Sequence, residues 1–100
     1  MKDIPIYLDK LRHLKFDLNS FCLLEERFGT IEKALQGLER GVLRAVRTIL
    51  WVGLSHEDPE LTEEDAGKLV NIGNLDMVGL TLLQALGEAG HEEEKNSGLH

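Results

Sequence analysis

The chain has 100 residues, 42% of them hydrophobic and 5% aromatic, and a formal net charge of −7. That size and composition are typical of one small helical domain. Residues 1–56 carry nine Lys and Arg against seven Asp and Glu, whereas residues 57–100 carry two against eleven. The acidic second half would repel a polyanion, so the charge disfavours a nucleic-acid-binding protein.

The sequence also indicates where the protein resides. No apolar run approaches the roughly 20 residues of a membrane-spanning helix, and the first residues, MKDIPIYLDK, lack the apolar segment of a secretory signal. The single cysteine, Cys22, cannot form an internal disulfide, which suits a reducing cytoplasm. We expect Cys22 to be a small buried side chain in a helix. These features predict a cytoplasmic protein with no membrane contact.

Two stretches of alternating residues open the chain. Apolar residues occupy every second position from Ile4 to Leu8, and again at Leu14, Phe16 and Leu18 in the run Leu11–Leu18. With Asp9-Lys10 as the turn, this spacing predicts a β-hairpin over about residues 4–18. Pro5 cannot donate a ladder hydrogen bond, so it must lie at an edge. Two strands alone are marginally stable. We therefore expect the helices to cover the shared apolar face of Ile6, Leu8, Leu14 and Phe16.

From Leu18 the apolar spacing changes to that of a helix. The spacing of three and four residues continues through Phe21, Leu24 and Phe28. Gly29 follows at the position where a helix would end. Thr30 is a good N-cap for a second, short helix. The apolar face of that helix would carry Ile31, Leu35 and Leu38.

A third and longer helix, from about Arg40 to Leu54, is expected to form the centre of the core. Its wide apolar face comprises Val42, Leu43, Ala45, Val46, Ile49, Leu50, Gly53 and Leu54. Asp58-Pro59 interrupts the chain. Thr62 then begins a short acidic helix that ends near Gly73, with Leu61 and Ala66 placed as a hydrophobic staple.

The last predicted helix has a leucine-rich face. Asn74 can cap it, and the face repeats through Leu75, Val78, Leu82 and Leu86. From Gly90 the chain reads HEEEKNSGLH, so we predict a disordered acidic tail over residues 90–100. The predicted fold is mainly α (α+β). A single domain over residues 1–89 would consist of an N-terminal β-hairpin followed by about five helices packed as a small bundle.

Three sequence motifs follow one another along the chain. The hairpin leads into an acidic-ended helix with LLEERFG at residues 23–29, the long helix ends in GLSHEDPELT at residues 53–62, and LTLLQALGEA at residues 80–89 closes the pattern. This arrangement, which covers roughly Ile4 to Ala89, resembles the tail assembly chaperones of siphophages, which are long-tailed bacteriophages, and of phage-like gene transfer agents.

The resemblance implies a non-catalytic chaperone of a bacteriophage or prophage, made in the host cell cytoplasm and absent from the mature virion. Such proteins are thought to hold the tape measure protein while tail tube subunits polymerise around it. The implied partners are therefore the tape measure protein and the tail tube protein, and a homo-oligomer stays open. The family brings no catalytic, metal or cofactor residues.

No grouping of residues indicates an enzyme. Glu25 and Glu26 would point to different sides of a helix, which is poor geometry for an acid–base pair. The loop residues His56-Glu57-Asp58 have metal-ligating side chains but lack a second cluster, so a solvated loop is favoured over a metal site. We therefore predict a protein without catalytic residues, bound metal or cofactor.

A stripe of residues on the third helix is the candidate partner-binding site. Arg40, Arg44, Arg47 and Trp51 fall at i, i+4, i+7 and i+11, opposite the apolar face. Trp and Arg are enriched at binding hot spots, which favours a protein–protein surface. The alternative is structural, with the Arg47 stem over the indole and the stripe partly covered by acidic helices. Both hold if the acidic tail shields the stripe until a partner displaces it.

Two other functions compete with the chaperone. The first is a structural component of a phage particle, either a head–tail connector or a tail terminator. The second is a small regulatory DNA-binding protein, which the net charge and the lack of a basic recognition helix disfavour.

Overall fold

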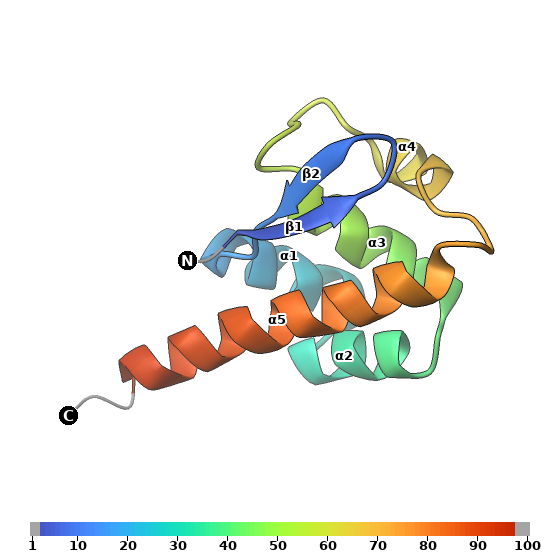
Figure 1. The fold of residues 1–100 in the computed structure, drawn as a ribbon. Coiled ribbons are helices and arrows are strands. Elements are labelled where there is room, and N and C mark those ends of the chain that lie inside the picture. Colours follow the sequence, from blue (N-terminus) through green and yellow to red (C-terminus); the bar gives the residue numbers. More distant parts are fainter. Residues whose placement is uncertain (1–2, 98–100) are drawn as a thin grey trace.

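An N-terminal hairpin is followed by five helices in the computed structural model, which describes the backbone of residues 3–97 and the side chains of residues 3–89 (Figure 1). The strands are β1 (Ile4–Tyr7) and β2 (Leu11–Leu14). The helices are α1 (Leu18–Phe28), α2 (Ile31–Glu39), α3 (Leu43–Leu54), α4 (Glu63–Lys68) and α5 (Leu75–Ser97). The predicted fold class is confirmed. None of the helices in this part of the chain is both long and apolar enough to span a membrane.

The two strands pair antiparallel, with Ile4 opposite Leu14 and Pro5 opposite His13. The backbone N–H of His13 donates to a carboxylate oxygen of Glu57 at 3.1 Å, so it points away from β1. Residues directly opposite each other in an antiparallel pair share this direction. The missing N–H of Pro5 therefore costs no hydrogen bond between the strands.

Strand β2 ends at Leu14, before the predicted end at Leu18. From Lys15 the backbone bonds to α3 instead of β1, because the N–H of Lys15 donates to the carbonyl oxygen of Gly53 at 3.0 Å. The alternating pattern continues inward nevertheless, since Phe16 is only 2% exposed. Ile6 and Leu14 are also buried and Leu8 is partly buried, so the predicted docking of the hairpin face is confirmed.

Local capping signals place most helix ends where the sequence predicted them. Gly29 ends α1 with a φ of +90°, a conformation that favours glycine. The Thr30 hydroxyl accepts from the backbone N–H of Lys33 at the start of α2. At the start of α4 the Thr62 side chain accepts from the N–H of Asp65, while the Asp65 carboxylate accepts from the N–H of Thr62. Cys22, expected to be buried, is exposed on α1.

Helix α3 lies at the centre of the core, as predicted, but begins later than expected. Gly41 has a φ of +70°, which separates α2 from α3, and Arg40 is the C-cap of α2. The helix is buried at Ala45, Val46, Thr48, Ile49, Leu50, Val52, Gly53 and Leu54. Val42 and Leu43, assigned to the core face from the sequence, are instead 47% and 65% exposed.

The segment between α4 and α5 also differs from the prediction. Helix α4 ends at Lys68 and not near Gly73. Asn74 stands just before α5, as expected of its cap, and its carbonyl oxygen accepts from the N–H of Val78 at 2.9 Å. Its side chain instead bonds the preceding loop: the amide donates to the carbonyl oxygen of Leu69, and the side-chain oxygen accepts from the N–H of Asn71. The Asn74 side chain therefore joins the two ends of the loop between α4 and α5.

Helix α5 crosses the molecule beside α2 and continues past the body of the bundle (Figure 1). The predicted apolar face is buried at Val78, Leu82 and Leu86. The sequence predicted a disordered tail from Gly90, but residues 90–97 continue the helix. That segment is rich in Glu and contains no proline, so it can extend a helix that packing has already nucleated. Residues 98–100 lie outside the described residues.

Candidate functional site

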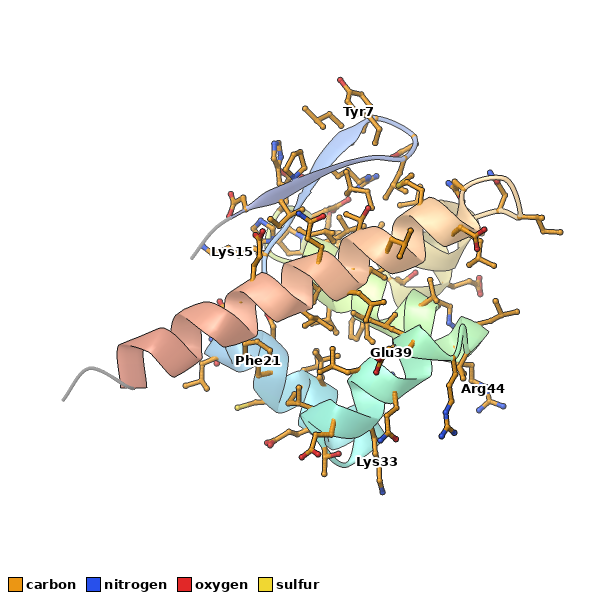
Figure 2. All side chains as sticks on the ribbon, turned by 60° about the horizontal axis from the view of Figure 1, so that its bottom comes forward. Tyr7, Lys15, Phe21, Lys33, Glu39 and Arg44 are labelled. Atoms are coloured by element: carbon orange, nitrogen blue, oxygen red, sulfur yellow. The ribbon has the colours of Figure 1, made fainter. Side chains whose placement is uncertain are left out.

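The predicted stripe is divided between two elements. Arg40 belongs to the turn after α2, whereas Arg44, Arg47 and Trp51 follow one another on α3. The three arginines are exposed, and the Arg44 side chain extends away from the bundle into solvent (Figure 2). Trp51 is partly buried and packs against the core cluster. The structure therefore keeps the arginines at the surface, whereas Trp51 is partly withdrawn into the core.

Trp51 has a structural role between helices. Its indole N–H donates to the carbonyl oxygen of Leu61 at 2.9 Å. The guanidinium carbon of Arg27 lies 5.2 Å from the ring centroid, within cation–π range. The structural alternative from the sequence had placed the Arg47 stem over the indole, but the cation–π contact is made by Arg27. Arg27 lies on α1, so only the packing of α1 beside α3 brings it to the ring.

Arg27 also connects α1 to α4 through Glu63. One guanidinium nitrogen of Arg27 is 2.6 Å from a Glu63 carboxylate oxygen, and the Thr48 hydroxyl donates to the other oxygen at 2.8 Å. Partial burial raises the pKa of Glu63, but the Thr48 hydroxyl and the Arg27 guanidinium outweigh it and lower that pKa below its usual value. This network holds the short helix α4 onto α1 and α3.

The loop containing HEDP holds the hairpin in place. Glu57 accepts from the backbone N–H of His13, and its second oxygen lies 2.9 Å from Nδ1 of the same residue. The hydrogen bonds from His13 lower the pKa of Glu57. Buried Arg12 donates to Asp9 at 2.8 Å and lies 3.5 Å from Asp58.

These contacts give His56, Glu57 and Asp58, considered as metal-ligating residues from the sequence, a structural role. The bond from Arg12 lowers the pKa of Asp9 to about 2, so Asp9 is ionised in the folded protein near neutral pH. His56 directs its Nδ1 at the carbonyl oxygen of Gly53, 3.0 Å away. The three residues therefore face separate partners in the fold. Within the described residues no group of three or more His, Cys, Asp or Glu side chains is placed to hold a metal ion.

Two adjoining clefts open at the end of the molecule where α3 and α5 begin, the end that Figure 1 shows on the right. The cleft between α3 and α4 has a volume of about 420 Å³, and the cleft between α2 and α5 has about 430 Å³. Val46 and Leu75 line both, so the two clefts form one surface, here called the terminal groove. Its apolar lining comprises Leu38, Leu43, Val46, Val70, Leu75, Leu80 and Leu83.

The terminal groove contains the arginines of the predicted stripe but not its tryptophan. Arg44 and Arg47 line the first cleft and Arg40 the second. The Arg47 stem lies against α4, because a β-carbon at Gly67 would be 3.1 Å from its Cδ. Acidic α4 thus covers part of the stripe, as the structural alternative expected. Trp51 lines neither cleft.

The charges around the groove are mixed, but its arginines lack partners. Lys68, Glu39, Glu64 and Asp76 also line the clefts. Among the described residues, the ion pairs within 4.0 Å join other groups: Arg12, His13 and Arg27 to their acidic partners. Arg40, Arg44 and Arg47 therefore present unpaired guanidinium groups beside an apolar surface. That combination is typical of a protein-binding surface.

The sequence missed the apolar half of this site. Leu43 was assigned to the core and Leu80 to no site, yet these side chains are 65% and 69% exposed. Gly41 was the available signal, since a glycine just before Val42 favours a turn and moves both Val42 and Leu43 out of the helix interior.

Comparisons with known proteins add no relative: no family model, no curated protein and no solved structure matches the chain.

Proposed function

We propose that this protein is a non-catalytic tail assembly chaperone of a siphophage or a related gene transfer agent. It binds the tape measure protein, the tail tube protein or both in the host cell cytoplasm, and it is absent from the mature virion. The order of hairpin, LLEERFG helix, GLSHEDPELT segment and Leu-rich last helix supports this proposal through the family resemblance.

One structural observation supports a binding role in particular. Three arginines that form no ion pair within the described residues line the same clefts as the exposed Leu43 and Leu80, at one end of the molecule. Exposed apolar surface beside unpaired arginines gains free energy when a partner covers it. We propose Arg40, Arg44 and Arg47 as contact residues. Trp51, named with them from the sequence, acts indirectly by holding α4 in place.

A chaperone that must release its client needs contacts that form and break readily. Arginines at an exposed rim contribute modestly to affinity and more to the rate of association. A small apolar groove with such a rim therefore suits reversible capture of a long helical client. The alternative is a structural role in the particle as a head–tail connector or tail terminator.

The chaperone proposal is tested by co-expression with the tape measure protein encoded in the same genome. We expect the tape measure protein to remain in the soluble fraction and to co-purify with the chain. Without the chain it should aggregate. The matched control is the chain with Arg40, Arg44 and Arg47 all changed to Glu, which should lose the client while keeping its own circular dichroism spectrum.

Purified particles separate the chaperone from the structural alternative. Mass spectrometry of intact particles should find no copies of this chain. A stoichiometric amount in the particle would contradict the chaperone and support the connector or terminator.

A further inference from the structure

We propose that the terminal groove binds an amphipathic helix that carries acidic residues on both sides of its apolar face. The inference rests on the proposed binding function and names the chemistry of the bound segment. It depends on three features of the groove: its apolar floor, its unpaired arginines, and the course of α5 away from it.

The floor of the groove is apolar, so apolar side chains of the bound helix are expected to fill it. Val46 and Leu75 join the two clefts, and the exposed side chains of Leu43 and Leu80 stand at their margins. Two clefts of about 420 and 430 Å³ can each accept large apolar side chains. An amphipathic helix presents such side chains at i, i+3, i+4 and i+7, which is how helices dock in grooves.

The rim sets the charge of the helix. Arg44 and Arg47 stand beside the first cleft and Arg40 beside the second. Because none of them forms an ion pair within the described residues, a carboxylate on the bound helix can reach a guanidinium without breaking an existing bond. Lys68 also lines the first cleft, so the four cations of the groove outnumber its three acids, Glu39, Glu64 and Asp76. The excess of cations lies in the first cleft, where a lysine-rich helix would meet like charge.

The acidic end of the same chain cannot be this helix. Helix α5 begins at the groove with Leu75 and runs away from it, so Glu92 lies about 25 Å along the helix axis at 1.5 Å per residue. Figure 1 shows the two ends of α5 at opposite sides of the molecule. The suggestion that the acidic tail shields the arginines within one chain is therefore not supported by this arrangement. The occupant therefore comes from another molecule, and we propose a partner protein.

The test uses two fluorescein-labelled peptides with the same leucine face, one with Glu and one with Lys at all flanking positions. Fluorescence anisotropy with the full chain should show binding of the Glu peptide and at least tenfold weaker binding of the Lys peptide. Raising the salt concentration should weaken the binding of the Glu peptide. Equal binding of the two peptides, or none by either, would overturn the proposal.

Matched variants locate the binding to the groove. Leu43 and Leu18 are the first residues of α3 and α1 and are 65% and 67% exposed, so Leu43→Gln and Leu18→Gln make the same change inside and outside the groove. Leu43→Gln should lower the affinity for the Glu peptide about tenfold, whereas Leu18→Gln should leave it unchanged. Likewise Arg44→Glu should weaken it about tenfold, whereas Lys33→Glu on the exposed face of α2 should have little effect (Figure 2).

The remaining outcomes separate this inference from the chaperone proposal. If Leu43→Gln and Leu18→Gln bind the Glu peptide alike, the groove is not the site, even if the tape measure protein still co-purifies. If the groove binds the Glu peptide but the tape measure protein does not co-purify, the chaperone proposal fails and the groove stands. Self-association of the chain that Leu43→Gln abolishes would assign the groove to a second copy and overturn the inference.

Discussion

At the scale of single residues, Gly53 sets how closely the hairpin approaches α3. A β-carbon at this position would lie 2.7 Å from Cζ of Phe16 and 2.8 Å from Cδ2 of Leu14. Both neighbouring side chains are buried, so neither can move aside into solvent. The absence of a side chain at Gly53 therefore lets the hairpin lie directly on the central helix.

We predict that Gly53→Ala lowers the free energy of unfolding by about 1 kcal/mol. Overpacking of this kind typically costs about 1–3 kcal/mol, while the higher helix propensity of Ala returns about 1 kcal/mol. Gly79→Ala in α5 is the control, because a β-carbon there meets nothing within 4 Å. It should raise stability by up to about 1 kcal/mol. Urea denaturation followed by circular dichroism measures both, and equal stabilisation by the two changes would contradict the close packing.

At the scale of elements, α4 is held by few contacts. It is six residues long, too short to be stable alone. Its attachment depends on Glu63, which is bonded by Arg27 of α1 and Thr48 of α3, and on Trp51, which bonds the preceding loop. Since α4 also forms one wall of the terminal groove, these contacts support the proposed binding surface from a distance.

We predict that Trp51→Ala destabilises the protein by about 2 kcal/mol, less than a fully buried aromatic residue because Trp51 is only partly buried. Trp51→Phe retains a ring beneath Arg27 but loses the hydrogen bond to Leu61, so about 1 kcal/mol should be lost. Arg47→Glu, an exposed change on the same helix, should alter stability by less than about 0.5 kcal/mol. Thermal unfolding checks the order. An unchanged midpoint for Trp51→Ala would contradict this structural role and favour Trp51 as a surface residue of the stripe.

At the scale of the whole molecule, α5 divides into a packed and a projecting part. Val78, Leu82, Ala85, Leu86 and Ala89 are buried at 9% exposure or less. Beyond them the helix continues to Ser97, away from the bundle (Figure 1). The fold therefore depends on the first part of α5, while residues 90–97 extend a helix that is already formed.

We predict that a chain ending at Ala89 keeps the thermal midpoint of the full chain within a few degrees. Its helical circular dichroism signal should fall only in proportion to the residues removed. A chain ending at Thr81, which loses buried Leu82 and Leu86, should not fold, because the core loses large apolar side chains. A large drop in the midpoint of the Ala89 chain would show that the segment after Ala89 packs in the full protein.

Much of the architecture could be predicted because it depends on neighbours close in sequence. The alternation around β1 and β2, Gly29 at the end of α1, and the caps at Thr30 and Thr62 all act within a few residues. The predicted helix ends were wrong where the apolar spacing of a helix continued in the sequence beyond the point at which the helix begins or ends. Gly41 at φ +70° moved the start of α3, and α4 ends at Lys68, before the loop whose ends the Asn74 side chain joins.

The candidate site shows the same division. The sequence by itself determined the hairpin, the order of the helices, the inward apolar faces and the three exposed arginines, because periodicity and capping fix these locally. Only the tertiary structure decided that Arg27 and not Arg47 covers Trp51, that Arg12 and His13 hold the HEDP loop, and that Leu43 and Leu80 stay exposed beside the arginines. The physical reason is that these contacts join residues from different elements, whose separation in space is set by how the helices pack and not by spacing along the chain.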